Sequence, residues 1–176
     1  MTTLLGISGA LRAASTNTHL IRHAAEIYDA DTFVQADLNL PLYNGDIEDA
    51  SGIPAAVQKL ADQIAGADAI IISTPEYNKS ISGVLKNALD WVSRTEGNVW
   101  ADKPVAIMSA TAGRSGGERT QFALRLCLMP FQCNVLQGPE VLVGGNYAEF
   151  DDAGRLTSDR YIKVLSDLME ALKSRS

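Results

Sequence analysis

Three polar loops, each following a short apolar segment, carry most of the residues that could bind a ligand. The first, residues 8–17, offers hydroxyl, amide and guanidinium groups just before a segment with helical spacing. Free backbone N–H groups and the helix dipole at such a position favour an anion, so a phosphate is the expected occupant. The alternative is that Ser15, Thr16 and Asn17 only compete to cap the helix.

The second loop, residues 75–82, combines an aromatic ring with polar side chains. Tyr77 and Asn78 could border a flat aromatic ligand with a ring face, a hydroxyl and an amide. Glu76 is a poor phosphate contact and is better suited to accept hydrogen bonds from a sugar-like chain or from backbone donors. A solvated turn is the alternative interpretation of this loop.

The third loop, residues 109–117, is rich in glycine and could pack its backbone closely against a ring. Taken together, the three loops fit a phosphorylated flat heterocycle. The chain has neither a Gly-x-Gly-x-x-Gly fingerprint nor a Gly-Lys-Ser/Thr loop, which disfavours a dinucleotide or triphosphate site. A fourth loop, bracketed by Gly144-Gly145-Asn146 and residues 151–154, could also carry function.

The segments that must position these loops alternate between apolar runs and stretches with helical spacing. Strands are expected at 4–7, 32–35, 69–72, 104–108 and 133–136, with 140–143 as a second candidate for the fifth. Helices are expected from residue 17, over 53–66, from 84, over 118–129 and from 157, and residues 37–52 are expected to form a surface loop.

This alternation predicts an α/β fold with a doubly wound, five-stranded parallel sheet in the order 2-1-3-4-5 and helices on both faces. The order brings the loops after strands 1, 3 and 4 to the same carboxyl edge, beside the switch point. The spacing also places Phe122, Leu126 and Met129 on one face of their helix. In the helix after residue 84, Trp91 and Arg94 are left over to meet another subunit.

The length and net charge of the chain limit the number of domains and the kinds of partner that it can bind. A chain of 176 residues is expected to form one domain, 1–176, and its formal net charge of −6 argues against nucleic acid or an anionic membrane surface. No signal peptide or long apolar span is present in the sequence, so we expect a cytoplasmic protein without membrane insertion. Cys127 and Cys133 match no metal or redox spacing, and a solvated face is favoured over a metal site for His19 and His23.

Three motifs resemble the NADPH-dependent FMN reductase family, and its chromate and quinone reductase branch most closely. They are Gly-Ala-Leu-Arg-x-x-Ser-x-Asn, Pro-Glu-Tyr-Asn-x-Ser followed by Gly-Val-Leu-Lys-Asn-Ala-Leu-Asp-Trp, and Gly-Gly-x-Arg-x-Gln-x-x-Leu-Arg. The resemblance runs from about residue 4 to about residue 145. It implies a flavodoxin-like fold, bound FMN, and self-association as a dimer or tetramer built partly on the helix after the second motif.

Matching positions assign roles to individual residues. The resemblance implies that Ser8, Arg12, Ser15 and Asn17 surround the FMN phosphate, and that Pro75, Glu76, Tyr77 and Asn78 line its isoalloxazine and ribityl region. Ser109, Thr111 and Gly113 stand in the third loop, and Ala10 replaces a serine that relatives usually have, so one phosphate hydroxyl is missing. Arg119 and Glu140 match a polar network across a subunit contact, in which Phe122 replaces a frequent tyrosine. Arg114 and Arg119 are candidates for the NADPH 2′-phosphate or for surface charges.

The implied reaction is a ping-pong one, in which NADPH or NADH reduces the flavin and a quinone, chromate or similar small-molecule electron acceptor reoxidises it. The flavin carries this chemistry, so no catalytic side chain is required and Tyr77 and Asn78 are positioning candidates. A non-enzymatic, flavodoxin-type electron carrier is the main alternative, and a purely structural α/β domain is the third. The sequence leaves open the physiological acceptor, the nicotinamide preference and the choice between dimer and tetramer.

Overall fold

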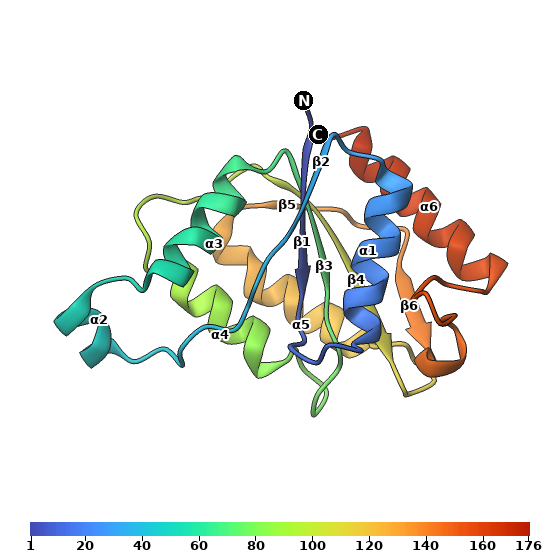
Figure 1. Ribbon diagram of the computed structural model, residues 1–176, viewed down its shortest axis with the longest axis horizontal. Coiled ribbons are helices and arrows are strands. Elements are labelled where there is room, and N and C mark those ends of the chain that lie inside the picture. Colours follow the sequence, from blue (N-terminus) through green and yellow to red (C-terminus); the bar gives the residue numbers. More distant parts are fainter.

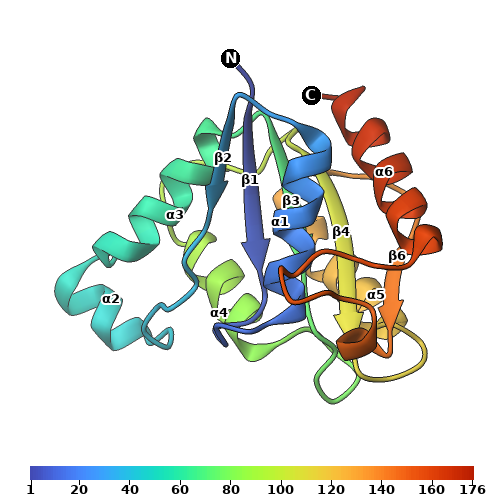
Figure 2. The same ribbon diagram turned by 45° about the vertical axis from the view of Figure 1, so that its right-hand side comes forward.

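A parallel β-sheet forms the middle layer of the chain, for which a computed structural model describes all residues from Met1 to Ser176. The strands pair in the order β2-β1-β3-β4-β5, as predicted, and β6 also pairs with β4. Their carboxyl ends share one edge, at the bottom of Figures 1 and 2. The strands are β1 (Thr3–Ser8), β2 (Thr32–Gln35), β3 (Ala69–Ser73), β4 (Pro104–Thr111), β5 (Asn134–Val135) and β6 (Val141–Gly144).

The fifth position of the sheet is shared by two short strands, so the sheet has six strands rather than the five expected. β5 pairs with the beginning of β4, at Pro104 and Val105, whereas β6 pairs with its end, from Met108 to Thr111. Both candidate segments for the fifth strand are therefore strands. Because β6 ends at the carboxyl edge, the loop that follows it joins the other three loops there.

Helices cover both faces of the sheet, and Figures 1 and 2 show α1 and α6 on the side opposite α3 and α4. No helix is both long and apolar enough to cross a membrane. The long helices are α1 (Thr16–Tyr28), α3 (Ala55–Gly66), α4 (Gly83–Val92), α5 (Glu118–Leu128) and α6 (Asp159–Lys173). The short ones are α2 (Gly45–Ser51), η1 (Met129–Phe131) and η2 (Asn146–Ala148).

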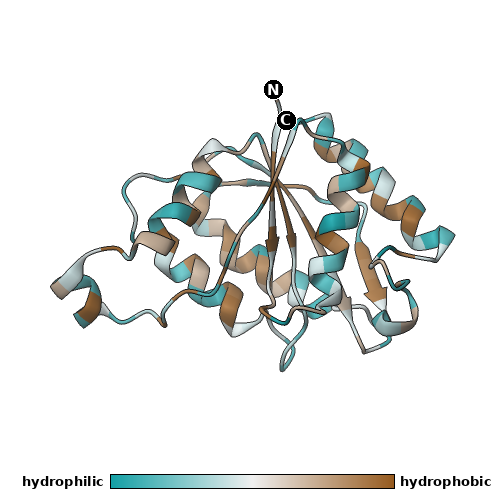
Figure 3. Cartoon of the chain, viewed as in Figure 1, coloured by the Kyte–Doolittle hydropathy of each residue, from teal (hydrophilic) through white to brown (hydrophobic).

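Alternating side chains of the strands supply two apolar cores, one on each face of the sheet. Ile70 and Ile72 of β3 pack with α3, α4 and α5, whereas Ile71 packs with α1 and α6. Every residue of β3 is buried, as expected for a central parallel strand. Figure 3 shows the strands as predominantly hydrophobic ribbons between helices with mixed faces.

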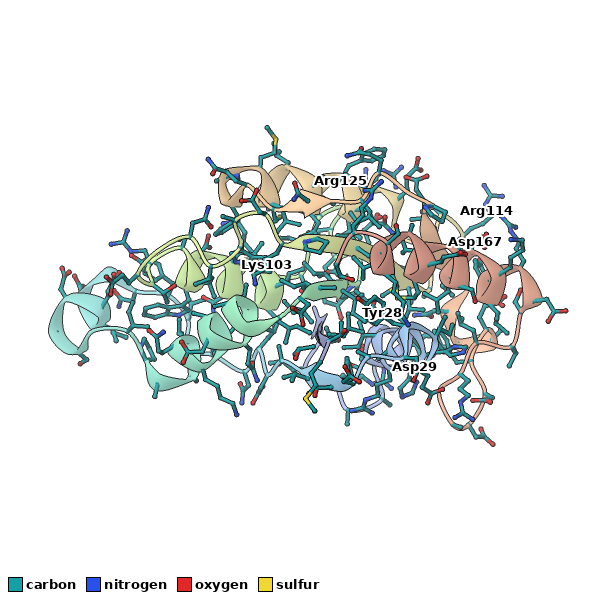
Figure 4. The ribbon with its side chains drawn as sticks, turned by 90° about the horizontal axis from the view of Figure 1, so that it is seen from above. Tyr28, Asp29, Lys103, Arg114, Arg125 and Asp167 are labelled. Atoms are coloured by element: carbon teal, nitrogen blue, oxygen red, sulfur yellow. The ribbon has the colours of Figure 1, made fainter.

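Polar contacts fasten the helix ends to their neighbours. Tyr28, the last residue of α1, lies 2.8 Å from Ser176 through the two hydroxyls, and its carbonyl accepts a 3.0 Å bond from Lys173 of α6. On the other face, Lys103 donates to the carbonyls of Ala65 and Ala67 at the end of α3, at 2.7 and 2.8 Å. Tyr28 and Lys103 are labelled in Figure 4. These bonds satisfy carbonyls at the ends of α1 and α3.

The segment expected to be only a surface loop, 37–52, contains α2, which has no buried residue. Figures 1 and 2 show α2 projecting from the body of the molecule. Trp91 is fully buried beneath this segment and donates from its indole to the Pro41 carbonyl at 2.7 Å, while Arg94 pairs with Glu48 at 3.1 Å. The expectation that Trp91 remains free to meet another subunit is therefore wrong, because its own chain buries it. Arg94 is still 52% exposed beside Glu48, so its part in a subunit contact stays a prediction.

The apolar stripe of α5 faces solvent. Phe122, Leu126 and Met129 are 60%, 68% and 71% exposed. The opposite face packs on the sheet although it is partly polar, because the Gln121 amide donates bonds of 2.9 Å to Ser109 Oγ and to the Val141 carbonyl. The buried residues of the helix are Thr120, Gln121, Leu124 and Leu128.

Candidate functional site

A pocket of about 310 Å³ lies at the carboxyl edge of the sheet. The loops after β1, β3, β4 and β6 all contribute to its wall, so the predicted convergence of three loops is observed and a fourth loop joins them. The predicted site residues that line it are Arg12, Ser15, Asn17, Pro75, Glu76, Tyr77, Thr111 and Gly113.

Three predicted site residues lie outside the pocket lining. The Ser8 hydroxyl is buried 2.8 Å from Thr18 Oγ1, and the Ser109 hydroxyl donates to the Gly116 carbonyl at 2.6 Å. Both serine hydroxyls therefore bond within the protein, outside the pocket lining, and stabilise the elements that form the pocket wall. Asn78 lies at the exposed tip of a turn, with a φ of 51°.

Several lining residues escaped the sequence-based prediction. Most are small, and a small side chain gives no chemical signal in a sequence. Asn146 and Tyr147 are different, because they follow the Gly144-Gly145 pair that marked a possible functional loop. The additional lining residues are Ala10, Ala14, Thr16, Ala110, Ala112, Ser115, Asn146 and Tyr147.

The N-terminus of α1 opens onto this pocket without a side-chain cap. Ser15 occupies the N-cap position in an extended conformation, but its hydroxyl makes no capping hydrogen bond. The N–H groups of the first turn and the positive end of the dipole are thus left for a ligand. Arg12 adds a guanidinium to the same end of the pocket and donates to the Tyr147 hydroxyl at 3.3 Å. This end suits a phosphate.

Asn17 ties three elements together beneath the pocket. Its Oδ1 accepts from the Ser73 hydroxyl at 2.8 Å and from the Ala110 N–H at 3.0 Å, and its Nδ2 donates to the Ala110 carbonyl at 2.9 Å. The side chain is 2% exposed. Asn17 therefore fixes the spacing of α1, β3 and β4 below the phosphate end, and its bonding capacity is largely used within the protein.

The second loop is a tight hairpin that presents a tyrosine. Tyr77 and Ser80 exchange two backbone hydrogen bonds of 3.0 and 3.1 Å, and both central residues have positive φ angles, 51° for Asn78 and 65° for Lys79. This pattern matches a two-residue turn of type I′. The turn holds Tyr77 at the pocket with 59% of its surface exposed, so its ring can border a flat ligand.

Two buried acceptor atoms in the pocket wall lack a hydrogen-bond partner. They are Glu76 Oε2 and Asn146 Oδ1. Glu76 Oε1 lies 3.7 Å from Arg119 Nη1, but the second oxygen is unmatched. Unsatisfied buried acceptors are costly, so a ligand that carries hydrogen-bond donors would stabilise this wall.

FMN fits this donor and acceptor set. Its phosphate suits Arg12 and the open helix terminus, and its ribityl hydroxyls and ring N–H can satisfy acceptors such as Glu76 and Asn146. Ala110, Ala112 and Gly113 add small side chains to the wall, which leave room for a planar ring. The residues of the pocket therefore match the cofactor that the sequence resemblance implies.

A parallel sheet in this order, with a polar pocket at the carboxyl edge beside its switch point, defines a protein of flavodoxin-like fold. The model of the family described as NADPH-dependent FMN reductase matches residues 2–148, and the chain belongs to this family. The predicted fold, cofactor and enzyme class are thereby confirmed.

Individual relatives agree with this assignment. An NAD(P)H-dependent FMN reductase of Pseudomonas aeruginosa is 40% identical over 97% of this chain and 92% of its own. A quinone reductase of Escherichia coli K12 is 41% identical over 77% of this chain and 74% of its own. The solved structure of a flavoenzyme NAD(P)H:(acceptor) oxidoreductase from Paracoccus denitrificans superposes with a TM-score of 0.88 at 29% identity, covering 99% of this chain and 97% of that chain.

Proposed function

We propose that this oxidoreductase holds FMN in the carboxyl-edge pocket and transfers electrons from NADPH or NADH to a quinone or a similar electrophile. The observation that carries the proposal is the composition of the pocket wall, which combines the uncapped N-terminus of α1 and the Arg12 guanidinium with an exposed tyrosine and several small residues. When bound, FMN supplies the two-electron chemistry between the nicotinamide and the acceptor.

The residues of the chain bind the cofactor and orient it in the pocket. Arg12 and Ser15 hold the phosphate, and Asn17 keeps the loops that carry them in register with β3 and β4. Glu76 accepts hydrogen bonds from the cofactor through its unmatched oxygen. Tyr77 borders the ring, and its exposed position leaves the mouth of the pocket accessible to a second flat molecule.

Anaerobic spectroscopy tests the reaction. The flavin-loaded protein is mixed with NADPH or NADH, and the visible absorbance of the oxidised flavin is expected to disappear and to return when a quinone is added. A flavin that stays oxidised with both nicotinamides would contradict the proposal and favour a flavodoxin-type electron carrier. Chromate and free FMN, tested alongside quinones, compare the possible acceptors.

We also propose that the chain self-associates through α5. Leu126 and Met129 of the exposed stripe lie beside a cavity of about 520 Å³, whose lining includes Cys127, Pro130 and Phe131. An exposed apolar stripe next to a cavity can be self-complementary about a two-fold axis, because each copy can place its stripe in the cavity of the other.

Two further observations on the same cavity support a second copy as the occupant. The indole N–H of Trp100, which also lines the cavity, is buried without an acceptor, and a partner chain could supply one. Helix α4 contributes Lys86 and Asp90 to the lining, and Ser93 follows directly after its end. The helix after the second motif would thus take part in assembly through these residues and without the buried Trp91.

A further inference from the structure

The loop after β6 forms a wall of the cofactor pocket that none of the three family motifs includes. Asn146 is 6% exposed and donates from Nδ2 to Thr16 Oγ1 at 2.7 Å, while its Oδ1 is left without a partner. Tyr147 accepts the hydrogen bond from Arg12 across the pocket. In this orientation the Asn146 amide can offer the ligand an acceptor, its Oδ1. In the flipped orientation, Oδ1 would accept from the Thr16 hydroxyl and Nδ2 could donate to the ligand.

This wall continues into a closed hairpin. Asp151 N donates to the Arg155 carbonyl at 2.9 Å, and Thr157 N donates to the Glu149 carbonyl at 3.0 Å. The Asp151 carboxylate also accepts from the backbone N–H groups of Ala153 and Arg155, at 2.9 and 2.8 Å. Residues 145–157, which we call the strap, are therefore bonded to one another through the backbone and the Asp151 carboxylate.

Three side chains of α1 fasten the strap. His23 Nδ1 accepts from the Leu156 N–H at 3.1 Å, and Glu26 pairs with Arg155 at 3.0 and 3.3 Å. His19 packs so closely on Gly154 that a Cβ there would lie 2.8 Å from the imidazole. His19, His23 and Glu26 follow helical spacing, so all three contact the strap from one side of α1. The sequence favours a solvated face for the two histidines, and the structure places them against the strap instead.

We propose that the strap retains FMN, with Asn146 contacting the ribityl and phosphate end of the cofactor and His23 positioning Asn146 through Leu156. The inference rests on the proposed function for the identity of the ligand. His23 lies on α1 away from the pocket lining, so it acts only by holding the strap against the helix.

The fastening bond requires a neutral imidazole. Nδ1 can accept from the Leu156 N–H only while it is unprotonated. Burial is the main cause that lowers the pKa of His23, and the charge of Arg155 lowers it further. The carboxylates of Glu26 and Asp151 act in the opposite direction and raise this pKa. Because this pKa is lower in the folded protein, the bond is stable above the ordinary histidine pKa of about 6.5 and is lost as pH falls through the lower folded value. FMN is therefore expected to leave faster in acid.

The test measures FMN dissociation by recovery of flavin fluorescence, from pH 5.5 to 8, together with hydrogen exchange of the Leu156 amide in the cofactor-free protein. Asn146→Ala is expected to increase the dissociation rate about tenfold, as for the loss of one hydrogen bond. His23→Leu is expected to lower the protection of the Leu156 amide about tenfold and to raise the dissociation rate several-fold at pH 8. His23→Asn, which keeps an acceptor near Nδ1 but cannot titrate, is expected to retain FMN and to show a weaker acid dependence than the wild type. The FMN phosphate, with a second pKa of about 6, titrates in both proteins.

Arg160→Gln, on exposed α6 surface, is the control and should change neither measurement. If His23→Leu exposes the Leu156 amide but both it and Asn146→Ala release FMN at the wild-type rate, the strap does not retain the cofactor. Unchanged protection in His23→Leu would instead overturn the fastening role. Both measurements are independent of turnover, so a protein that binds FMN but is not reduced by a nicotinamide would contradict the proposed function and leave this inference intact.

Discussion

Gly9 shows how closely the first two site loops are joined. Its N–H donates to the Ser73 carbonyl at 2.8 Å, and its own carbonyl accepts from the Ser82 hydroxyl at 2.6 Å. A Cβ at this position would lie 2.7 Å from Thr74 Oγ1 and 3.1 Å from Ser82 Oγ. The glycine is therefore required by space, because both loops close on it.

We predict that Gly9→Ala lowers the free energy of unfolding by about 1–3 kcal/mol, the usual cost of overpacking. FMN binding should weaken as well, since the first two loops separate. Urea unfolding and flavin titration measure the two effects. Gly83→Ala is the matched control, because a Cβ there meets nothing within 4 Å, and a loss of stability as large as that of Gly9→Ala would refute the steric argument.

Arg12 is the one guanidinium that lines the pocket. We predict that Arg12→Ala raises the dissociation constant for FMN by about 10- to 100-fold, because a charge-assisted hydrogen bond contributes about 1.5–3 kcal/mol. Riboflavin, which lacks the phosphate, should bind wild type and variant equally. An equal loss of affinity for both ligands would place the phosphate elsewhere. Arg160→Ala serves as the control.

The reactivity of the Cys133 thiol should reflect its burial. Burial raises its pKa to about 11, so at pH 8 only about one thiol in a thousand is ionised. We predict that iodoacetamide labels Cys133 roughly two hundred times more slowly than a free cysteine at pH 8, with a rate that rises tenfold per pH unit up to about pH 11. Labelling followed by peptide mass spectrometry measures this rate, and a plateau near pH 8.5 would show an exposed thiol. Because the folded pKa is the higher one, this group reduces stability as pH rises above about 8.5.

Among the secondary-structure elements, those with one dominant apolar signal were predictable from sequence. The run from Ala69 to Ile72 defines β3, and Leu85, Leu89 and Val92 define the buried face of α4, because burial of apolar surface drives both. The strand order followed from the same alternation.

The elements that sequence missed lack such a signal. Helix α2 has no buried residue, so no periodicity marks it. In α5 the buried face includes Thr120 and Gln121, whereas the most apolar stripe is exposed, so periodicity alone cannot tell which face packs on the sheet. For Asn146 the glycine pair before it marked only a possible functional loop, because its place in the pocket depends on β6 continuing the fifth strand position to the carboxyl edge.

The segment that contains α2 offers a prediction at the scale of an element. Asn87 of α4 donates to the Pro41 carbonyl at 3.0 Å and accepts from the Tyr43 N–H at 2.8 Å. We predict that Asn87→Ala accelerates proteolytic cleavage within 41–52 several-fold while the free energy of unfolding falls by less than about 2 kcal/mol, because α2 contributes nothing to the core. Asn98→Ala, which removes one exposed bond to Phe131, is the control. Unchanged cleavage would show that Trp91 and the Arg94–Glu48 pair hold the segment without Asn87.

At the scale of the whole molecule, the site and the proposed assembly surface occupy different parts of the chain. The pocket uses the loops at the carboxyl edge, whereas the cavity beside α5 is lined by the ends of α4 and α5 and by residues 97–100. The two surfaces share no lining residue. A change in one can therefore be made without altering the other, which makes self-association testable in a protein that still binds its cofactor.

We predict that Leu126→Glu shifts the protein from an oligomer toward a monomer, because it places a charge in the centre of the exposed stripe on α5. Leu126 is 68% exposed, so the substitution should leave the folded chain and its FMN affinity unchanged. Leu42→Glu is the matched control, since Leu42 is 79% exposed but lies next to α2, and this variant should assemble like the wild type. Sedimentation velocity at micromolar concentrations, with and without FMN, measures the outcome. A wild type that sediments as a monomer, or a Leu126→Glu variant that assembles normally, would exclude α5 as the contact, whereas disruption by Leu42→Glu would assign assembly to the segment around α2.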